Sequence, residues 1–472
     1  MSVLPSIAQC RRAFRSAKSS TAIGSAADFD GRVFRGDRKQ GLFCRPICVY
    51  TAPAEEDERF FASAAAASAA GFVACPHCQP EYAPRCPDWV LGERSLIAAV
   101  RSIERQLGSP AQLGSGTSQT LAEHFLERLG ATPDQYQSWQ RIMLAKRLLD
   151  GTDWSQSSVA LAAGMTSTSQ LGRSMQRCFG ATPSVLRKRC QTTNKLAARA
   201  IRLPVRAPYD AQWVTDFLTK RALPGLEEVR GGTYHRRLPS SARSQQMPGH
   251  WLQVGIGAGE LRVNLPQQAA ADTAQLLARV QQVFDAHADP LAIRRVLKTD
   301  PGINRSVRAA PGLRVCGAWD GFETTVRAIL GQQVSVARAR NLAIELIARF
   351  GSAGNFPTPN ELVEADVAAV GMPGKRGGAV RALARAVLEG QLVLEDSADP
   401  QSLFEGLCAL PGIGPWTAGY VSMRVVGDAD AFPRADWVVL RRLEMTGARA
   451  EQHSLRWQPY RAYALMHIWR GD

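Results

Sequence analysis

The sequence of 472 residues has no uninterrupted apolar run of the roughly 18 residues that a membrane-spanning helix needs. Its first segment, MSVLPSIAQCRRAFRS, also has no continuous apolar core of the kind found in secretory signal peptides. These absences predict a cytoplasmic protein without a membrane partner. Acidic residues are the scarcer charge, with 42 Asp and Glu against 57 Lys and Arg, which gives a net charge of +15. Such a basic balance fits a nucleic-acid partner, although solubility alone could also account for it.

The ten cysteines suit a reducing cytoplasm better than a disulfide framework, because most of them are scattered. Four are clustered, with Cys44 and Cys48 spaced as C-x3-C and Cys75 and Cys78 as C-x2-C. A short Ala-rich segment, predicted to be helical from Arg59 to Ala70, separates the two pairs. Two close cysteine pairs can complete a tetrahedral thiolate shell around zinc. The spacing therefore predicts a zinc site, and a purely structural site is the simplest interpretation.

The segments around these cysteines, FDGRVFRGDRKQGLFCRPIC, FFASAAAASAAGF and CPHCQPE, resemble the N-terminal domain of the Ada-type alkylation-response proteins. The resemblance implies that the four cysteines hold zinc and that Cys44 also accepts a methyl group from a methylated DNA phosphotriester. Zinc keeps a thiol deprotonated, and the thiolate is the nucleophile. Methylating one sulfur would remove a negative charge, so the domain should then bind DNA more tightly. Arg45 is expected to contact a phosphate.

A fifty-residue repeat organises the next part of the chain. The motif LGATP at Leu129–Pro133 recurs as FGATP at Phe179–Pro183. A predicted helix from Gln137 to Leu149 joins two units that each consist of a helix, a turn and a second helix, with the turns at Leu113–Ser115 and Ala163–Met165. This pattern resembles the AraC-type DNA-binding domain, with recognition helices over Ser118–Leu129 and Ser167–Phe179.

The resemblance implies DNA contacts from Gln170 and Arg173 on the second recognition helix, with promoter DNA and RNA polymerase as partners. Both helices depart from those of a strong binder. The first has few basic groups near its start, and Gly172 costs the second about 1 kcal/mol relative to Ala. A purely structural helical module is therefore a second interpretation.

Alternating apolar and polar runs follow a basic, linker-like segment at 190–203. The predicted strands are Gly225–Val229, Gly232–Arg237, His250–Gly255 and Glu260–Leu265. Predicted helices over Trp213–Leu223 and Ala269–Phe284 flank them. Period-two patterning interrupted by Gly and Pro is typical of an antiparallel sheet. From Asp289 onwards almost all of the sequence is helical in pattern.

The stretch LPGIGPWTAGYVSMRVVGDADAFPRAD has the clearest chemical signature of the chain. One helical pattern ends, the chain turns through Gly412, Ile413 and Gly414, and a second helix starts at a proline. Bare amides in this turn, with a helix N-terminus behind them, suit a DNA phosphate. Asp436 follows one helix later. An acid near a phosphate site indicates chemistry on a nucleic-acid strand, whereas the alternative is an ordinary hairpin with a surface acid.

This stretch resembles the helix-hairpin-helix superfamily of DNA glycosylases. PYDAQWVTDFL and the long segment beginning PGLRVCGAWDGFETTVRAILGQQVSV resemble its AlkA-type 3-methyladenine members. The resemblance runs from Arg202 to the C-terminus and implies that Asp436 is the catalytic carboxylate. A carboxylate can stabilise positive charge on the sugar and present water while an alkylated purine leaves. The base must first be flipped out of the duplex.

Aromatic side chains should form the pocket, because a cationic base gains cation–π energy against them. The expected pocket residues are Trp416, Tyr420, Trp437 and Trp469. Trp416 stands where strand-cutting relatives have a lysine, so a Schiff base cannot form there and a monofunctional enzyme is expected. Gln332 and Gln333 lie in the loop that, by resemblance, probes the gap left by the flipped base. Asp428 and Asp430 are expected to be solvated.

The sequence thus predicts a multidomain protein, mainly α with α+β parts. The expected domains are a zinc methylphosphotriester domain (1–88), an AraC-type double helix-turn-helix (89–192), an α+β AlkA-type domain (202–308) and an all-α helix-hairpin-helix glycosylase domain (309–472). The expected function is a monofunctional DNA-3-methyladenine glycosylase combined with a methyl acceptor and a transcription regulator, acting as a monomer on alkylated and promoter double-stranded DNA. The alternative is a regulator whose glycosylase-like half only docks on DNA. A glycosylase for oxidised bases is a third interpretation, which Trp416 and the aromatic pocket disfavour.

Overall fold

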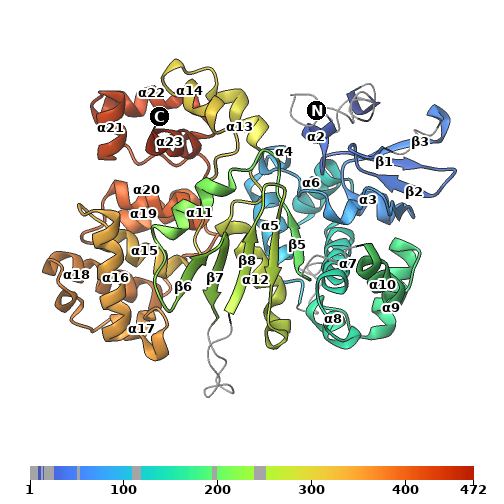
Figure 1. Cartoon of the computed structure of the whole chain (residues 1–472). Helices are drawn as coiled ribbons and strands as arrows, with labels where there is room; N and C mark the ends of the chain where they lie inside the picture. Colours follow the sequence, from blue (N-terminus) through green and yellow to red (C-terminus); the bar gives the residue numbers. More distant parts are fainter. Residues whose placement is uncertain are drawn as a thin grey trace. The chain divides into compact units, whose positions relative to one another are not determined.

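The computed structural model describes residues 9–11, 14, 26–49, 54–108, 118–193, 199–238 and 251–471 (Figure 1). The chain divides into two compact units, which are Met1–Ala207 with Gly259–Ala278 and Pro208–Ala258 with Arg279–Asp472. The boundaries of the four expected domains remain predictions. None of the described helices is long and apolar enough to cross a membrane.

A four-stranded sheet of order β3-β1-β2-β4 lies in the first unit. Its strands are β1 (Phe34–Asp37), β2 (Leu42–Cys44), β3 (Glu58–Phe61) and β4 (Val73–Ala74). β1 pairs antiparallel with β2 and β3, and β2 pairs parallel with β4. The short helices of this part are α2 (Ala26–Phe29), η1 (Glu55–Asp57), α3 (Ala64–Ala69) and η2 (Pro80–Tyr82).

The helix expected over Arg59–Ala70 is wrong in its first part. Arg59 and Phe61 belong to β3, which pairs with β1 more than twenty residues earlier in the chain. The helix begins only after Ser63, whose hydroxyl accepts a hydrogen bond from the backbone N–H of Ala66 at 3.1 Å. Distant pairing, which local composition does not reveal, decides the strand.

Helices make up the next part of the first unit. They are α4 (Asp88–Leu91), α5 (Arg94–Arg105), α6 (Gln119–Leu129), α7 (Pro133–Gly151), α8 (Gln156–Ala162), α9 (Thr168–Phe179) and α10 (Pro183–Thr193). Helices α6 and α9 lie where the sequence predicts two helices, and Ser118 and Ser167 cap their first turns. Their role as recognition helices stays a prediction. The glycines of the repeated motif, Gly130 and Gly180, end them at φ of 64° and 63°. The expected turn at Leu113–Ser115 lies outside the described residues.

The segment expected to be a linker at 190–203 contains structure at both ends. Helix α10 continues to Thr193, and β5 (Ile201–Pro204) pairs antiparallel with β9 (Glu260–Asn264). Four residues are too few to reveal their alternation in the sequence, and the partner strand lies almost sixty residues further along the chain. The 3-10 helix η4 (Gln267–Asp272) and α12 (Thr273–Val283) follow β9.

The second unit begins with α11 (Ala211–Thr219) and an antiparallel set of strands. These strands are β6 (Glu227–Arg230), β7 (Thr233–Arg237) and β8 (Trp251–Ile256), as the alternating pattern predicted.

The remainder of this unit is helical. Its elements are α13 (Pro290–Leu297), α14 (Pro301–Ala309), α15 (Gly321–Leu330), α16 (Val336–Phe350), η5 (Ser352–Gly354), α17 (Pro359–Leu362), η6 (Val367–Val370), α18 (Gly374–Leu388), α19 (Pro400–Cys408), α20 (Pro415–Val421), the π-helical turn η7 (Ser422–Val426), α21 (Trp437–Leu443), α22 (Gly447–Ser454), η8 (Leu455–Trp457) and α23 (Arg461–Arg470).

Two apolar cores organise these helices. One core includes Val326, Leu346 and Val421 and lies among α15 to α20. The other includes Val439 and Leu465 and holds α13, α14, α21 and α23 together (Figure 1). Tyr420 packs against both cores, which places the C-terminal end of α20 where they meet.

Candidate functional site

Asp436 is a buried carboxylate at the start of α21, with an exposed fraction of 6%. Its Oδ1 accepts hydrogen bonds from the backbone N–H of Val439 at 3.0 Å and from Nε1 of Trp469 at 3.1 Å. Its Oδ2 accepts from Nε1 of Trp416 at 2.9 Å. An aspartate at this position satisfies a free N–H of the first helical turn. Three charge-assisted hydrogen bonds compensate the burial of its charge and fix its orientation.

Aromatic rings surround this carboxylate. The rings of Trp416 and Tyr420 are stacked, with centroids 5.6 Å apart and planes at 11°. The ring of Trp469 lies 6.3 Å from that of Tyr420. These three side chains and Asp436 line a cavity of about 790 Å³ in the second unit. The structure therefore brings together four of the predicted site residues, while their roles remain predictions.

Arg424 is a buried residue that also lines this cavity, and it was not recognised from the sequence. Its NH1 donates to the phenol oxygen of Tyr420 at 2.5 Å, and its NH2 donates to the carbonyl of Gly317 at 3.0 Å. Burial alone would raise the pKa of Tyr420, but the positive charges of Arg424, Arg221 and Arg327 outweigh burial and lower it from its ordinary value. The spacing of four residues from Tyr420 was the available sequence signal.

The expected phosphate turn is present, with differences in detail. Gly412 has a φ of 83°, whereas Gly414 has a φ of −99°, so only Gly412 needs the freedom of glycine. The backbone N–H of Ile413 donates to the carbonyl of Leu410 at 3.2 Å, and the Ile413 side chain is buried in a core. The amide of Ile413 is therefore already used within the hairpin, and the phosphate contact of this turn stays a prediction.

The loop between α15 and α16 is joined to this turn. Nε2 of Gln332 donates to the carbonyl of Gly412 at 3.0 Å and to Oγ1 of Thr417 at 3.1 Å. Gln333 is exposed and has a φ of 55°, which is uncommon for a residue other than glycine. Gln332 thus supports the hairpin, and Gln333 is the residue of the pair that is presented to solvent.

Two other sequence expectations do not match the positions found. Trp437 is 67% exposed, does not line the cavity and lies against Arg441, whose guanidinium carbon is 5.1 Å from the ring centroid. Because Asp436 is the capping residue that turns inward, the next residue of the helix points in a different direction. Asp430 is not simply solvated, since it forms an ion pair with Arg461 at 2.8 Å.

The four predicted zinc ligands converge in the first unit. The Sγ atoms of Cys44, Cys48, Cys75 and Cys78 all lie within 4.8 Å of one another. Hydrogen bonds among the four thiols lower the pKa of Cys75 and raise the pKa of Cys44 and of Cys78, so these bonds favour a thiolate at Cys75 and not at the other two. Four converging sulfur donors fit the tetrahedral shell of structural zinc.

Arg45, next to Cys44, forms hydrogen bonds with residues around the four cysteines. Its Nε donates to Oδ1 of Asp30 at 2.9 Å, and its NH1 donates to the carbonyl of Cys78 at 3.1 Å. Its backbone N–H also donates to Sγ of Cys78 at 3.2 Å. These hydrogen bonds fix the segment that contains Cys78. The predicted phosphate contact of Arg45 would have to form while the guanidinium keeps these hydrogen bonds.

The two residues predicted to contact DNA lie on α9. The side chain of Gln170 accepts hydrogen bonds from the backbone N–H of Thr166 at 2.8 Å and from its Oγ1 at 3.0 Å. Arg173 is exposed. Arg173 is therefore available to a partner, whereas Gln170 braces the turn before its helix.

Three family models match successive parts of the chain. They are the metal binding domain of Ada at residues 18–81, a helix-turn-helix domain at 115–189 and the AlkA N-terminal domain at 200–320. These matches coincide with the thiol cluster, the repeated helical units and the strands that precede the glycosylase-like helices.

Similar proteins extend the comparison to the whole chain. The Mycobacterium tuberculosis protein "Probable bifunctional transcriptional activator/DNA repair enzyme AlkA" is 33% identical over 473 residues, which cover 94% of this chain and 93% of the relative. The Escherichia coli "DNA-3-methyladenine glycosylase 2" is 36% identical over 273 residues, covering 56% of this chain and 94% of the relative. The Escherichia coli "Bifunctional transcriptional activator/DNA repair enzyme Ada" is 31% identical over 166 residues, which cover 34% of this chain and 45% of the relative.

Proposed function

Because the chain belongs to the family of bifunctional transcriptional activator and DNA repair enzymes named AlkA, we propose that Asp436 is the catalytic group of a DNA-3-methyladenine glycosylase. The chain combines a repair glycosylase with a zinc-containing, DNA-binding regulator. The observation that carries the catalytic assignment is the triply hydrogen-bonded carboxylate of Asp436 inside an aromatic cavity.

The proposed reaction hydrolyses the N-glycosidic bond of an alkylated purine. The damaged nucleotide is flipped out of the duplex, and its base enters the cavity beside Trp416 and Tyr420. As the bond breaks, positive charge develops on the sugar, and the fixed carboxylate of Asp436 stabilises that charge and orients the attacking water. Trp469 and Trp416 keep the carboxylate in place before the substrate arrives, so no reorganisation is needed.

Incubation of the protein with methylated and unmethylated duplex DNA tests this function. We expect abasic sites on the methylated duplex only, with the strand intact until alkali is added, because Trp416 offers no amine for a Schiff base. Failure to release alkylated purines would contradict the glycosylase assignment. Strand cleavage without alkali would contradict only the monofunctional assignment.

The thiol cluster is proposed to accept a methyl group on Cys44. Zinc held by Cys44, Cys48, Cys75 and Cys78 would keep their sulfurs deprotonated. A lone pair on the Cys44 sulfur forms the new bond to the methyl carbon as the C–O bond of the phosphotriester breaks, which leaves a phosphodiester. Digestion and mass spectrometry after incubation with DNA methylphosphotriesters should find the methyl group on Cys44. Its absence, or its appearance on Cys48, Cys75 or Cys78, would contradict the assignment.

The remaining partners follow from the regulator half. We propose that α6 and α9 bind promoter DNA, that RNA polymerase is contacted there, and that the protein acts as a monomer in the cytoplasm. The alternative is a transcription regulator whose glycosylase-like half binds DNA without catalysing a reaction. The second unit does not support this alternative, because binding DNA does not require a buried carboxylate at a cavity.

A further inference from the structure

Asp430 anchors the loop that leads to Asp436, although it does not line the cavity. Nε of Arg461 donates to Oδ1 of Asp430 at 2.9 Å, and NH2 of Arg461 donates to Oδ2 at 2.8 Å. Nε2 of Gln458 donates to the same Oδ2 at 3.1 Å. Two parallel hydrogen bonds between a guanidinium and a carboxylate fix the orientation of both groups as well as their distance. The side chains of Arg461 and Asp430 are 21% and 27% exposed, so solvent screens their charges and the geometry of this fork matters more than its charge.

The main chain joins the same two segments. The backbone N–H of Ala462, next to Arg461 in α23, donates to the carbonyl of Ala429 at 3.0 Å. Ala431, on the other side of Asp430, is buried in the core to which α23 contributes. The beginning of the loop is therefore bound to the first turn of α23 by side chain, main chain and packing.

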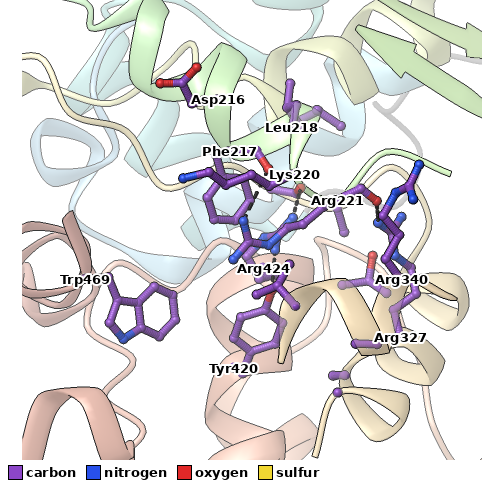
Figure 2. A pocket seen from close by; sticks show the side chains of 18 of the residues that line it. Asp216, Phe217, Leu218, Lys220, Arg221, Arg327, Arg340, Tyr420, Arg424 and Trp469 are labelled. Carbon is purple, nitrogen blue, oxygen red and sulfur yellow. Dashed lines mark hydrogen bonds between the residues drawn. The ribbon is translucent and has the colours of Figure 1, made fainter. Parts of the chain in front are cut away.

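The end of the loop is held by the same helix. Trp469, which lines the cavity (Figure 2), lies eight residues after Arg461 in α23 and donates to Oδ1 of Asp436 at 3.1 Å. A rise of about 1.5 Å per residue separates the two α23 positions by about 12 Å along the helix axis. A single rigid helix therefore holds both ends of the segment 430–436.

Apolar contacts hold the middle of this segment. The ring of Phe432 lies 6.1 Å from that of Trp457. Pro433 lies against Gly419 of α20, where an added Cβ would be 3.5 Å from Cα of Pro433. Such contacts are not directional, so they allow the segment to shift along the surface on which it packs. The directional hydrogen bonds at the two ends of the segment are then the ones that set the position of Asp436.

We propose that Asp430 and Arg461 are positioning residues for the glycosylase reaction, which set the distance between the carboxylate of Asp436 and the sugar of the flipped nucleotide. This inference rests on the proposed glycosylase function and adds residues outside the cavity to it. Neither side chain lines the cavity, so each acts on the reaction only through Asp436. A carboxylate that stabilises developing charge must be held within roughly 0.5 Å, and a misplacement of about 1 Å can lower a rate about 100-fold. Loss of the fork should therefore slow the chemical step more than it weakens DNA binding.

Single-turnover rates at saturating protein on duplex DNA that contains 7-methylguanine test this role. Arg461→Met removes the fork and should slow excision by roughly tenfold or more, while the Kd for an undamaged duplex stays near that of the wild type. Arg461→Lys keeps the charge but not the fork, so its rate should lie between those of Arg461→Met and the wild type. Asp430→Asn removes the carboxylate with almost no change in size, so it carries the test if Arg461→Met does not fold.

Two abasic analogues separate positioning of the carboxylate from a general loss of stability. A duplex with a pyrrolidine in place of one sugar presents a positive charge at neutral pH, whereas a tetrahydrofuran has a similar shape and no charge. The wild type should bind the pyrrolidine duplex more tightly, because the carboxylate of Asp436 would lie beside that charge. Arg461→Met and Asp430→Asn should lose most of this preference and keep their affinity for the tetrahydrofuran duplex. Weaker binding of both duplexes by the same factor would indicate general damage to the DNA-binding surface and would overturn the inference.

Arg385→Met is the matched control, because Arg385 pairs with Glu364 at 2.8 Å on the surface of the same unit and does not line the cavity. Its excision rate and its preference for the pyrrolidine duplex should equal those of the wild type. Wild-type rates and preferences in both Arg461→Met and Asp430→Asn would also overturn the inference. A wild-type protein that neither excises 7-methylguanine nor prefers the pyrrolidine duplex would instead contradict the proposed function itself.

Discussion

Asp436 serves the fold and the proposed chemistry with the same carboxylate. One oxygen caps α21 through Val439, and both oxygens receive an indole N–H. Trp416 and Trp469 are therefore more than aromatic walls of the cavity, since they orient the carboxylate beside which we propose that the base binds. The sequence indicated the grouping of these residues, but their hydrogen bonds could be seen only once α20, α21 and α23 were placed.

Trp469→Phe tests this role of the indole at the level of one atom. The substitution keeps an aromatic ring and removes the N–H that donates to Asp436. We expect the single-turnover rate on DNA that contains 7-methylguanine to fall by roughly ten- to a hundredfold, because a hydrogen bond to a charged group contributes about 1.5–3 kcal/mol. Trp437→Phe is the control, since that exposed ring lies outside the cavity, and its rate should stay near that of the wild type. Equal effects of the two substitutions would contradict the assignment.

His467 should make stability depend on pH. Burial lowers its pKa from 6.5 to about 4, with a smaller contribution from Arg470, and its ring lies 3.1 Å from Oγ of Ser306. Because the folded state holds the ring neutral, the stabilisation is complete above pH 6.5 and is lost as the pH falls towards 4. The loss at pH 5 should be about 2 kcal/mol.

Thermal unfolding at pH 7 and pH 5 measures this loss. His467→Gln should show a smaller decrease in stability between the two pH values than the wild type. An identical decrease in both proteins would show that other groups cause the pH dependence.

At the scale of elements, the helix ends that short sequence motifs specify were predicted correctly from the sequence. The repeated GATP motif predicted where α6 and α9 end, because it combines a helix-stopping glycine with the cap of the next helix. The structure shows this cap at the start of α7, where the side chains of Thr132 and Gln135 form a capping box. The strands β3 and β5 could not be predicted in the same way, because each is defined by a partner far away in the sequence.

Gly172 and Gly164 provide a matched pair of substitutions in the helix-turn-helix part. A Cβ added at Gly172, within α9, would meet no atom within 4 Å, so Gly172→Ala should raise stability by about 0.5–1 kcal/mol. Gly164 has a φ of 66°, and its added Cβ would lie 2.0 Å from the carbonyl oxygen of Leu107, so Gly164→Ala should be destabilising. Urea unfolding of the two variants checks the opposite signs. Destabilisation by Gly172→Ala would contradict the account of this helix.

At the scale of the whole molecule, the chain contains two compact units with different chemistry. The thiol cluster and the repeated helices belong to the first unit, and the cavity with Asp436 belongs to the second. Cysteine spacing predicted the thiol cluster, whereas the grouping of Trp416, Trp469 and Asp436 was expected from the resemblance to the glycosylases, and the roles of these residues stay predictions. Sequence patterns could not reveal that Arg424 is buried with no carboxylate at ion-pair distance among the described residues, or that Trp437 does not line the cavity, because these features depend on how distant helices pack.

Metal removal should affect only one of these units. β2 ends at Cys44 and β4 directly precedes Cys75, so the metal joins two paired strands, and its binding energy contributes to folding. Treatment with a strong chelator should lower the unfolding temperature of the first unit. Abasic-site formation on methylated DNA should be unchanged, and a parallel loss of this activity would show that the second unit depends on the metal.

The single-turnover rate of Asp436→Asn on methylated duplex DNA tests the central claim most directly. Asparagine is also a good helix-capping residue, so the fold of α21 should persist while the negative charge is lost. We expect the rate to fall at least about 100-fold, whereas Asp428→Asn, which changes an acid that does not line the cavity, should remain close to the wild type. An Asp436→Asn protein that releases alkylated purines at the wild-type rate would contradict the account.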